Sequence, residues 1–243
     1  MMKIVLNGAK GRMGRIVDEA AAAGGHSVVA RVDFGYAEGE GLRTLAEYQG
    51  PADVVIDFSN HAATAQVTEY CAQRGLPVII ATTGQTRDEL ALIDAAAKAV
   101  PVFLSANMSL GVALLADLAK KAAAVFPEAD IEIIEKHHNQ KLDVPSGTAL
   151  LLARRIQEAR PEAQFVIGRH ENGKRTKAEI GIHSLRLGNE VGVHEIIIAT
   201  GSETITLKHE AENRSLFAQG ALAAAAFIVG KAPGLYDMRS IIE

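Results

Sequence analysis

The stretch "KIVLNGAKGRMGRIVDEAAAAGG", residues 3–25, decides the fold of the N-terminal half. A short β-branched run at residues 3–8 leads into a glycine-rich turn, and a helical pattern over residues 12–25 then ends at two glycines. The glycines of the turn follow the spacing G-x-x-G-x-x-G, at Gly8, Gly11 and Gly14. Such glycines let the N–H groups of a helix N-terminus approach a pyrophosphate. The stretch therefore predicts either a dinucleotide-binding loop or a plain tight turn between strand and helix.

Strand and helix patterns alternate from this stretch to about residue 106. The runs predicted as strands are continuously apolar, as expected when helices cover both faces of a sheet. They span residues 26–33, 52–59, 76–82 and 100–106, and the helices among them span residues 61–75 and 86–99. The alternation predicts an α/β domain over residues 1–106, built on a doubly wound parallel, Rossmann-like sheet.

The pattern changes after residue 106. A helix at 110–126, a strand at 129–139 and a helix from about 148 to 159 precede four strand-like runs, at residues 163–170, 178–188, 190–200 and 203–211. Adjacent strands with short connections make an antiparallel sheet, so we expect a C-terminal α+β domain over residues 107–213 with an open mixed or antiparallel sheet. The last helix could pack on either domain, and we assign the final helical segment, about residues 214–243, to the first.

Composition narrows the classes of function. The 243 residues are 48% hydrophobic and 22% charged, which is ordinary for a soluble globular protein. The net charge of -4 and the lack of a basic tract argue against nucleic acid as a partner. The N-terminal apolar run is too short for a signal peptide, and the alanine-rich run near the C-terminus is too short for a membrane span. With Cys71 as the one cysteine, no internal disulfide can form, and a cytoplasmic protein is expected.

Further polar segments follow the predicted strands. Asp33 ends the second strand about 20 residues past the glycines, where an acid can bind the adenosine ribose. Phe34 stands where an arginine could receive a 2′-phosphate, which favours NADH, although Arg12 or Arg31 could still serve NADPH. The segments "ATTG" and "SANMS", at residues 81–84 and 105–109, lie at strand ends where a nicotinamide ring could pass, although the first could equally cap a helix.

The segment "EKHHNQKLDVPSGTALLLARRI", residues 135–156, combines two imidazoles, an ammonium and a helix start. His137 and His138 point to opposite sides of a strand, and a turn after them brings Lys141 back. A Pro-Ser-Gly-Thr turn then offers backbone N–H groups to an anion. Together these groups favour a substrate carrying carboxylates and a supply of protons. Adjacent histidines rarely converge on one ion, so no metal site is expected.

These motifs, with "GAKGRMG" and the terminal "GLYDMR", closely resemble the 4-hydroxy-tetrahydrodipicolinate reductase (dihydrodipicolinate reductase) family over nearly the whole chain. The run E-x-H-H-x-x-K-x-D-x-P-S-G-T-A is highly specific to that family. The resemblance implies that His137 and Lys141 are catalytic, His137 as a proton donor or acceptor and Lys141 as a second proton donor, and either could give the final proton. Substrate-binding residues are expected to be His138, Ser146, Gly147 and Thr148. Residues expected to contact NADH or NADPH are Gly8, Ala9, Lys10, Gly11, Arg12, Met13, Asp33, Ala81, Thr82, Thr83, Ser105, Ala106, Asn107 and Met108.

The resemblance also implies the reaction and the assembly. The family reduces a cyclic hydroxy dicarboxylate with loss of water, in the diaminopimelate route to lysine. Its members are commonly homotetramers built through the second domain, which also binds substrate. Two alternative functions would require different residues. A semialdehyde dehydrogenase requires a cysteine nucleophile beside the nicotinamide, and Cys71 is expected in mid-helix. A non-catalytic dinucleotide sensor would need the glycine loop but no proton donors.

Overall fold

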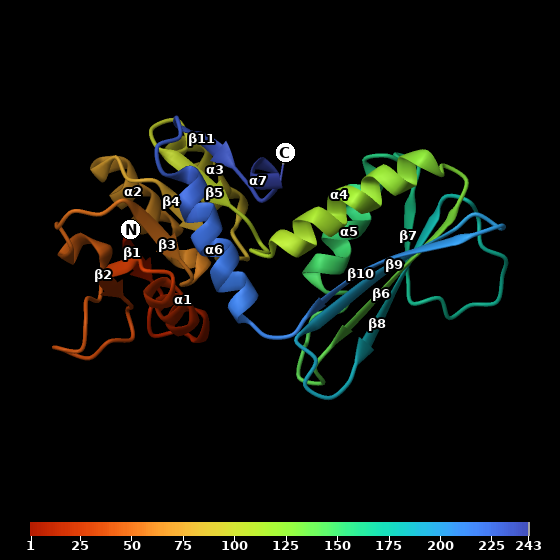
Figure 1. Ribbon diagram of the computed structural model, residues 1–243, viewed down its shortest axis with the longest axis horizontal. Coiled ribbons are helices and arrows are strands. Elements are labelled where there is room, and N and C mark those ends of the chain that lie inside the picture. Colours follow the sequence, from red (N-terminus) through yellow and green to blue (C-terminus); the bar gives the residue numbers. More distant parts are fainter. Residues whose placement is uncertain (243) are drawn as a thin grey trace. The chain divides into compact units, whose positions relative to one another are not determined.

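The structure is a computed structural model that describes residues 1–242, and it divides into two compact units (Figure 1). The first unit contains residues 1–109 and the C-terminal segment from residue 214. The second unit contains residues 110–213. None of the described helices has the length and apolarity needed to cross a membrane.

The first unit is built on a parallel sheet of six strands in the order β11-β5-β4-β3-β1-β2. The strands are β1 (Lys3–Asn7), β2 (Ser27–Val32), β3 (Val54–Asp57), β4 (Val78–Ile80), β5 (Pro101–Leu104) and β11 (Gly234–Tyr236). The chain starts at β1, adds β2 on one side and β3 on the other, so the strand order reverses beside β1. In open α/β sheets, ligands bind at the carboxyl ends of the strands at such a reversal.

Helices cover both faces of this sheet. They are α1 (Arg12–Ala23), α2 (Thr64–Arg74), α3 (Arg87–Ala96) and α6 (Ser215–Ile228), with short helices η1 (Leu45–Glu47), η2 (His61–Ala63) and α7 (Arg239–Ile242). α1 packs against α6, and α2 packs against α3. Val5 joins the apolar cluster of α2 and α3, while its neighbours Ile4 and Leu6, also fully buried, point the other way. Burial on both faces explains why β1 reads as continuously apolar.

The final helix is shorter than predicted. α6 ends at Ile228, so the helical segment assigned to about residues 214–243 is wrong in extent. Gly230 takes a left-handed conformation (φ 82°) and Pro233 cannot continue a helix, so the chain leaves α6 there. The next residues form β11 beside β5, a strand that the sequence pattern does not reveal.

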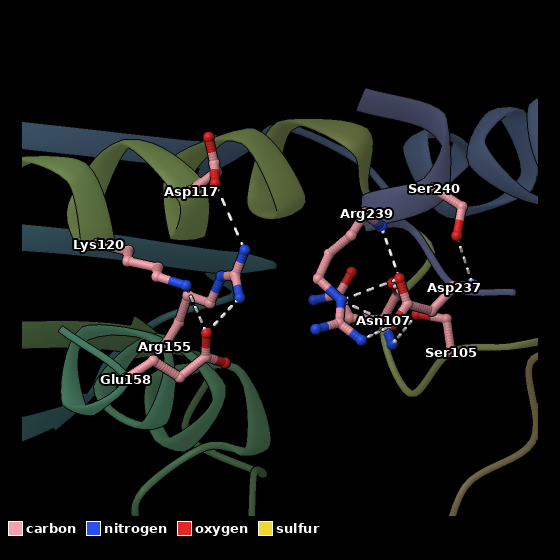
Figure 2. A network of polar contacts seen from close by, with 9 residues as sticks. All are labelled: Ser105, Asn107, Asp117, Lys120, Arg155, Glu158, Asp237, Arg239 and Ser240. Atoms are coloured by element: carbon pink, nitrogen blue, oxygen red, sulfur yellow. Dashed lines mark hydrogen bonds and ion pairs between the residues drawn. The ribbon is translucent and has the colours of Figure 1, made fainter. Parts of the chain in front are cut away.

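The second unit places two helices, α4 (Leu110–Val125) and α5 (Gly147–Gln157), on one face of a five-stranded sheet. The strand order is β10-β9-β6-β8-β7. The strands are β6 (Asp130–His137), β7 (Gln164–Ile167), β8 (Glu179–Arg186), β9 (Gly192–Ala199) and β10 (Thr204–Ala211). Isoleucines of the sheet pack with Leu115 and Leu152 in the unit's core. An ion-pair cluster of Lys120, Glu158, Arg155 and Asp117 joins α4 to α5 (Figure 2).

The sheet of the second unit is mixed, and the expectation that its short connections make neighbours antiparallel is wrong for β7 and β8. β8 pairs parallel to both β7 and β6, whereas β9 pairs antiparallel to β6 and β10. The connection 168–178 is long enough to carry the chain back along the sheet. β8 and β9 are not neighbours, because β6 lies between them. Crossing one strand spans about 10 Å, which the five residues 187–191 can cover.

Candidate active site

The glycine turn of the first unit is packed too closely for side chains. Gly8 has a φ of 81°, and a Cβ there would lie 2.6 Å from the Phe58 carbonyl group. A Cβ on Gly14 would lie 2.1 Å from the Gly8 oxygen. Gly11 precedes α1 without providing a side-chain cap. The first N–H groups of α1 therefore face the turn as an anion-binding helix end, which fits a dinucleotide pyrophosphate.

Asp33 lies directly after β2 and connects the glycine turn to the loop that follows β2. One carboxylate oxygen accepts a hydrogen bond from the Lys10 N–H at 2.9 Å, and the other accepts from the Gly35 N–H at 2.8 Å. The Lys10 ammonium group is paired with Glu40 at 3.0 Å. The predicted acid thus stands beside the predicted pyrophosphate turn, as a ribose ligand requires.

A buried carboxylate that the sequence analysis missed organises the strand ends. Asp57 is 2% exposed and accepts hydrogen bonds from Asn7 (2.8 Å), Ser59 (2.6 Å) and Thr82 (2.8 Å). Burial raises the pKa of Asp57, although these hydrogen bonds act in the opposite direction. The network joins the carboxyl ends of β1, β3 and β4, so predicted cofactor residue Thr82 is held by its side chain. The sequence did carry a signal for Asp57, because it is a charged residue at the end of an otherwise apolar, buried strand.

The segment "SANMS" forms a compact turn after β5. The Ser105 hydroxyl donates to the Asn107 carbonyl at 2.7 Å, and the Asn107 side chain accepts from the Ser109 N–H at 2.8 Å. Figure 2 shows Ser105 and Asn107 beside Asp237 and Arg239, which follow β11. The terminal "GLYDMR" motif therefore supports this turn. Predicted cofactor residue Met108 is 2% exposed, and its carbonyl oxygen packs against Gly220 of α6.

The second unit contains a buried imidazole–carboxylate pair at the end of β6. His137 is 8% exposed, and its Nδ1 lies 2.5 Å from Oε2 of Glu135, which is fully buried. Arg186 donates to both Glu135 oxygens at 2.8 Å, and the Ser146 N–H donates at 3.1 Å. Burial alone would raise the pKa of Glu135, but hydrogen bonds from His137, Arg186 and Ser146 outweigh it and hold that pKa well below its ordinary value.

A second imidazole lies against the first. The His194 ring meets the His137 ring edge-on at 5.2 Å between centroids. Its Nε2 lies 3.1 Å from the Ser146 hydroxyl, which also accepts the Ala149 N–H and so caps α5. Burial, followed by the charge of His137, lowers the pKa of His194 to about 3. His194 is therefore neutral at physiological pH.

The turn predicted after the two histidines is present, and Lys141 lies at its end. The Lys141 N–H donates to the His138 carbonyl at 3.2 Å, and the His138 N–H donates to the Glu190 carbonyl at 2.8 Å. The Lys141 ammonium group pairs with Asp143 at 2.8 Å, and its side chain is 22% exposed. Gly147 and Thr148 are the first residues of α5. Of the predicted residues, Ser146, Gly147 and Thr148 thus form the start of α5, and Lys141 lies in the turn that follows β6.

Sequence reasoning missed Glu135, Arg186 and His194. Glu135 could have been found, because residues i and i+2 of a strand share a face and His137 follows at that spacing. Arg186 and His194 are about 50 residues distant and carried no local signal. Cys71 is fully buried in α2, and burial raises its thiol pKa, which excludes it as a nucleophile. Residues 1–242 contain no group of three or more side chains suited to a metal ion.

Comparisons with known proteins agree over the whole chain. The family described as dihydrodipicolinate reductase, N-terminus, matches residues 2–108, and dihydrodipicolinate reductase, C-terminus, matches residues 111–242. The 4-hydroxy-tetrahydrodipicolinate reductases of Caldanaerobacter subterraneus and Clostridium tetani are 44% and 43% identical, covering 100% of this chain and 99% and 98% of theirs.

Solved structures extend the likeness. Dipicolinate-bound dihydrodipicolinate reductase from Paenisporosarcina sp. TG-14 is 26% identical with a TM-score of 0.78, covering 98% of this chain and 97% of its own. Amine dehydrogenase from Mycobacterium smegmatis, at 11% identity and a TM-score of 0.66, covers 98% of this chain and 95% of its own and shares the fold alone. From the two family matches and the full-length relatives, we conclude that the chain belongs to the dihydrodipicolinate reductase family.

Proposed function

We propose that this protein reduces 4-hydroxy-tetrahydrodipicolinate to tetrahydrodipicolinate with NADH or NADPH, with loss of water, in the diaminopimelate route to lysine. The observation that carries the proposal is the tie between His137 and the N-terminus of α5 through Glu135, with His138 and Lys141 following β6, within a chain whose relatives bear that activity as their name. Cationic side chains and a helix N-terminus suit a dicarboxylate, and the solved relative bound to dipicolinate holds a ligand of that class.

The first unit would hold the nicotinamide cofactor. Residues Gly8 to Met13 surround the uncapped start of α1 and would bind its pyrophosphate, and Asp33 would accept hydrogen bonds from the adenosine ribose. The strand-end loops of Ala81 to Thr83 and Ser105 to Met108 would face the nicotinamide. When bound, the cofactor supplies the hydride, and the protein supplies orientation and charge.

We propose NADH as the preferred cofactor. A 2′-phosphate would meet the Asp33 carboxylate, and two cations of that region are already paired, Lys10 with Glu40 and Arg31 with Asp18. A third, Arg43, stacks on the Phe34 ring. Kinetics with both cofactors test this: kcat/KM should favour NADH, and Asp33→Ser should shift the ratio at least about tenfold towards NADPH. The control Asp53→Ser, at the opposite end of the sheet, should leave the ratio unchanged. An unshifted ratio in Asp33→Ser would refute the assignment.

The proton that completes the reduction would come from the second unit. His137 presents Nε2 away from Glu135, and the Lys141 ammonium group can exchange Asp143 for a substrate carboxylate. A positioned side chain that transfers a proton contributes about 10²-fold or more to kcat. His137→Ala and Lys141→Ala should each lose that factor, whereas the exposed controls His170→Ala and Lys174→Ala should keep wild-type kcat. Near-normal kcat in both site variants would refute these two proton donors, whereas a wild-type protein without reductase activity would favour the non-catalytic sensor.

We also propose that the protein is a homotetramer assembled through the second unit. The face of its sheet opposite α4 and α5 carries partly exposed apolar side chains, including Ile134, Leu185 and Ile197. Light scattering should give the mass of four chains for wild type, and Ile197→Glu should produce smaller species, because a buried charge without a partner opposes association. Lys174→Glu is the matched control. A monomeric wild-type protein at micromolar concentration would contradict this assembly.

A further inference from the structure

We propose that Glu135 and Arg186 are positioning residues, which fix the tautomer of His137 and hold the N-terminus of α5 through one buried carboxylate. The inference rests on the proposed function, since it assigns what prepares the proposed proton donor and the proposed anion site. Neither residue needs to touch the substrate. Both act through the groups that do.

The Glu135 carboxylate accepts four hydrogen bonds from His137, Arg186 and Ser146, two on each oxygen. Oε2 accepts from His137 Nδ1 (2.5 Å) and from Arg186 (2.8 Å), while Oε1 accepts from Arg186 (2.8 Å) and from the Ser146 N–H (3.1 Å). An ionised carboxylate only accepts hydrogen bonds, so the neutral His137 ring carries its proton on Nδ1. Nε2 is then the nitrogen that can accept or release a proton at the substrate side.

Gly192 avoids a side chain against that side of the ring. A Cβ at this position would lie 3.1 Å from His137 Nε2, closer than ordinary contact. The adjacent His194 ring is less suited to the role, because its Nε2 is engaged by the Ser146 hydroxyl and its Nδ1 is buried. The geometry therefore leaves His137 Nε2 as the nitrogen of this pair suited to proton exchange.

Arg186 lets a buried anion lie beneath an anion-binding helix end. Glu135 reaches the first turn of α5 through the Ser146 N–H, and an uncompensated charge there would repel a substrate carboxylate. The two-pronged pairing with Arg186 neutralises Glu135 while leaving its oxygens as acceptors. Burial of the carboxylate makes that compensation obligatory.

Replacing Glu135 by glutamine should invert the tautomer. At the Oε1 position the glutamine NH2 would face two groups that can only donate hydrogen bonds, the Ser146 N–H and the Arg186 guanidinium. At the Oε2 position it would face Arg186 and His137, and an imidazole can exchange donor for acceptor by moving its proton. The NH2 group should therefore turn to His137, placing the ring proton on Nε2.

Nitrogen-15 NMR of histidine-labelled protein at pH 8 tests this directly, with His137→Gln to assign the resonance. Wild type should show the Nδ1–H tautomer, and Glu135→Gln the Nε2–H tautomer together with a kcat lower by about 10²-fold to 10⁴-fold and little change in substrate KM. The dissociation constant for NADH, a property of the first unit, should stay the same. Arg186→Lys, which keeps the charge but loses the fork, should give an intermediate kcat.

An Nε2–H tautomer in the wild-type protein would overturn the inference without any variant, even if Glu135→Gln failed to fold. So would an unchanged Nδ1–H signal or a kcat within twofold of wild type in folded Glu135→Gln. Failure of the proposed function has a different signature, because the tautomer would still invert while the wild-type protein showed no reductase activity on the proposed substrate. The two hypotheses are thereby tested separately.

Discussion

His194 should make the stability of the second unit depend on pH. The side chain is 4% exposed, and among residues 1–242 its Nδ1 has no hydrogen-bond partner. A proton on this ring would bury a charge beside His137, which explains the pKa of about 3 in the folded protein. The perturbation is His194→Gln, which keeps a polar side chain in reach of Ser146 but cannot take up a proton.

The magnitude follows from the two protonation equilibria. In the unfolded chain a histidine binds its proton near pH 6.5, whereas folded His194 stays neutral down to about pH 3. The stability contributed by the neutral ring is therefore fully present above pH 6.5 and is lost as the pH falls towards 3. Between pH 7 and pH 5 the unfolded state gains about 2 kcal/mol relative to the folded state from this one residue.

Urea unfolding followed by circular dichroism at pH 7, 6 and 5 measures the effect. Between pH 7 and pH 5, wild type should lose about 2 kcal/mol more of its free energy of unfolding than His194→Gln does. The exposed His170, changed to Gln, provides the matched control and should follow wild type. Equal pH dependence in wild type and His194→Gln, or an NMR titration of His194 midway between pH 6 and 7, would refute the reasoning.

Three substitutions test the packing and the glycine turn. Gly220→Ala should destabilise the first unit by about 1–3 kcal/mol in urea unfolding, because its Cβ would lie 1.6 Å from the Met108 oxygen. The control Gln219→Ala, one residue away and exposed, should leave the stability unchanged, and a stabilised Gly220→Ala would contradict the packing. Arg160→Ala should cost about 1–3 kcal/mol of unfolding free energy, since its guanidinium caps backbone carbonyls at the end of α4; an unchanged urea midpoint would disprove that cap. Gly14→Ala should weaken NADH binding at least about tenfold by fluorescence titration, as its Cβ would clash within the glycine turn, and wild-type affinity would rule out this role.

The sequence by itself determined the class of the first unit and its elements up to β5. The signals used were local: uninterrupted apolar runs, helix patterns of period 3.6, and the spacing of Gly8, Gly11 and Gly14. The apolar patterns indicate which residues of each element are buried, and the glycines indicate a tight turn. The doubly wound parallel sheet predicted from these signals was confirmed, and so was the family resemblance, which rested on the motifs themselves. Similarly, the turn after His138 could be expected from the residues that form it.

Tertiary structure alone decided which elements became neighbours. Periodicity says that a strand is buried but not which strand it pairs with, so β6 lying between β8 and β9, and β11 lying beside β5, were beyond its reach. The same holds for the candidate site. A buried carboxylate must find compensating donors wherever the fold supplies them, and Glu135 finds Arg186 on a neighbouring strand about 50 residues away. Sequence spacing brings Glu135 to His137, but strand pairing brings Arg186 to Glu135.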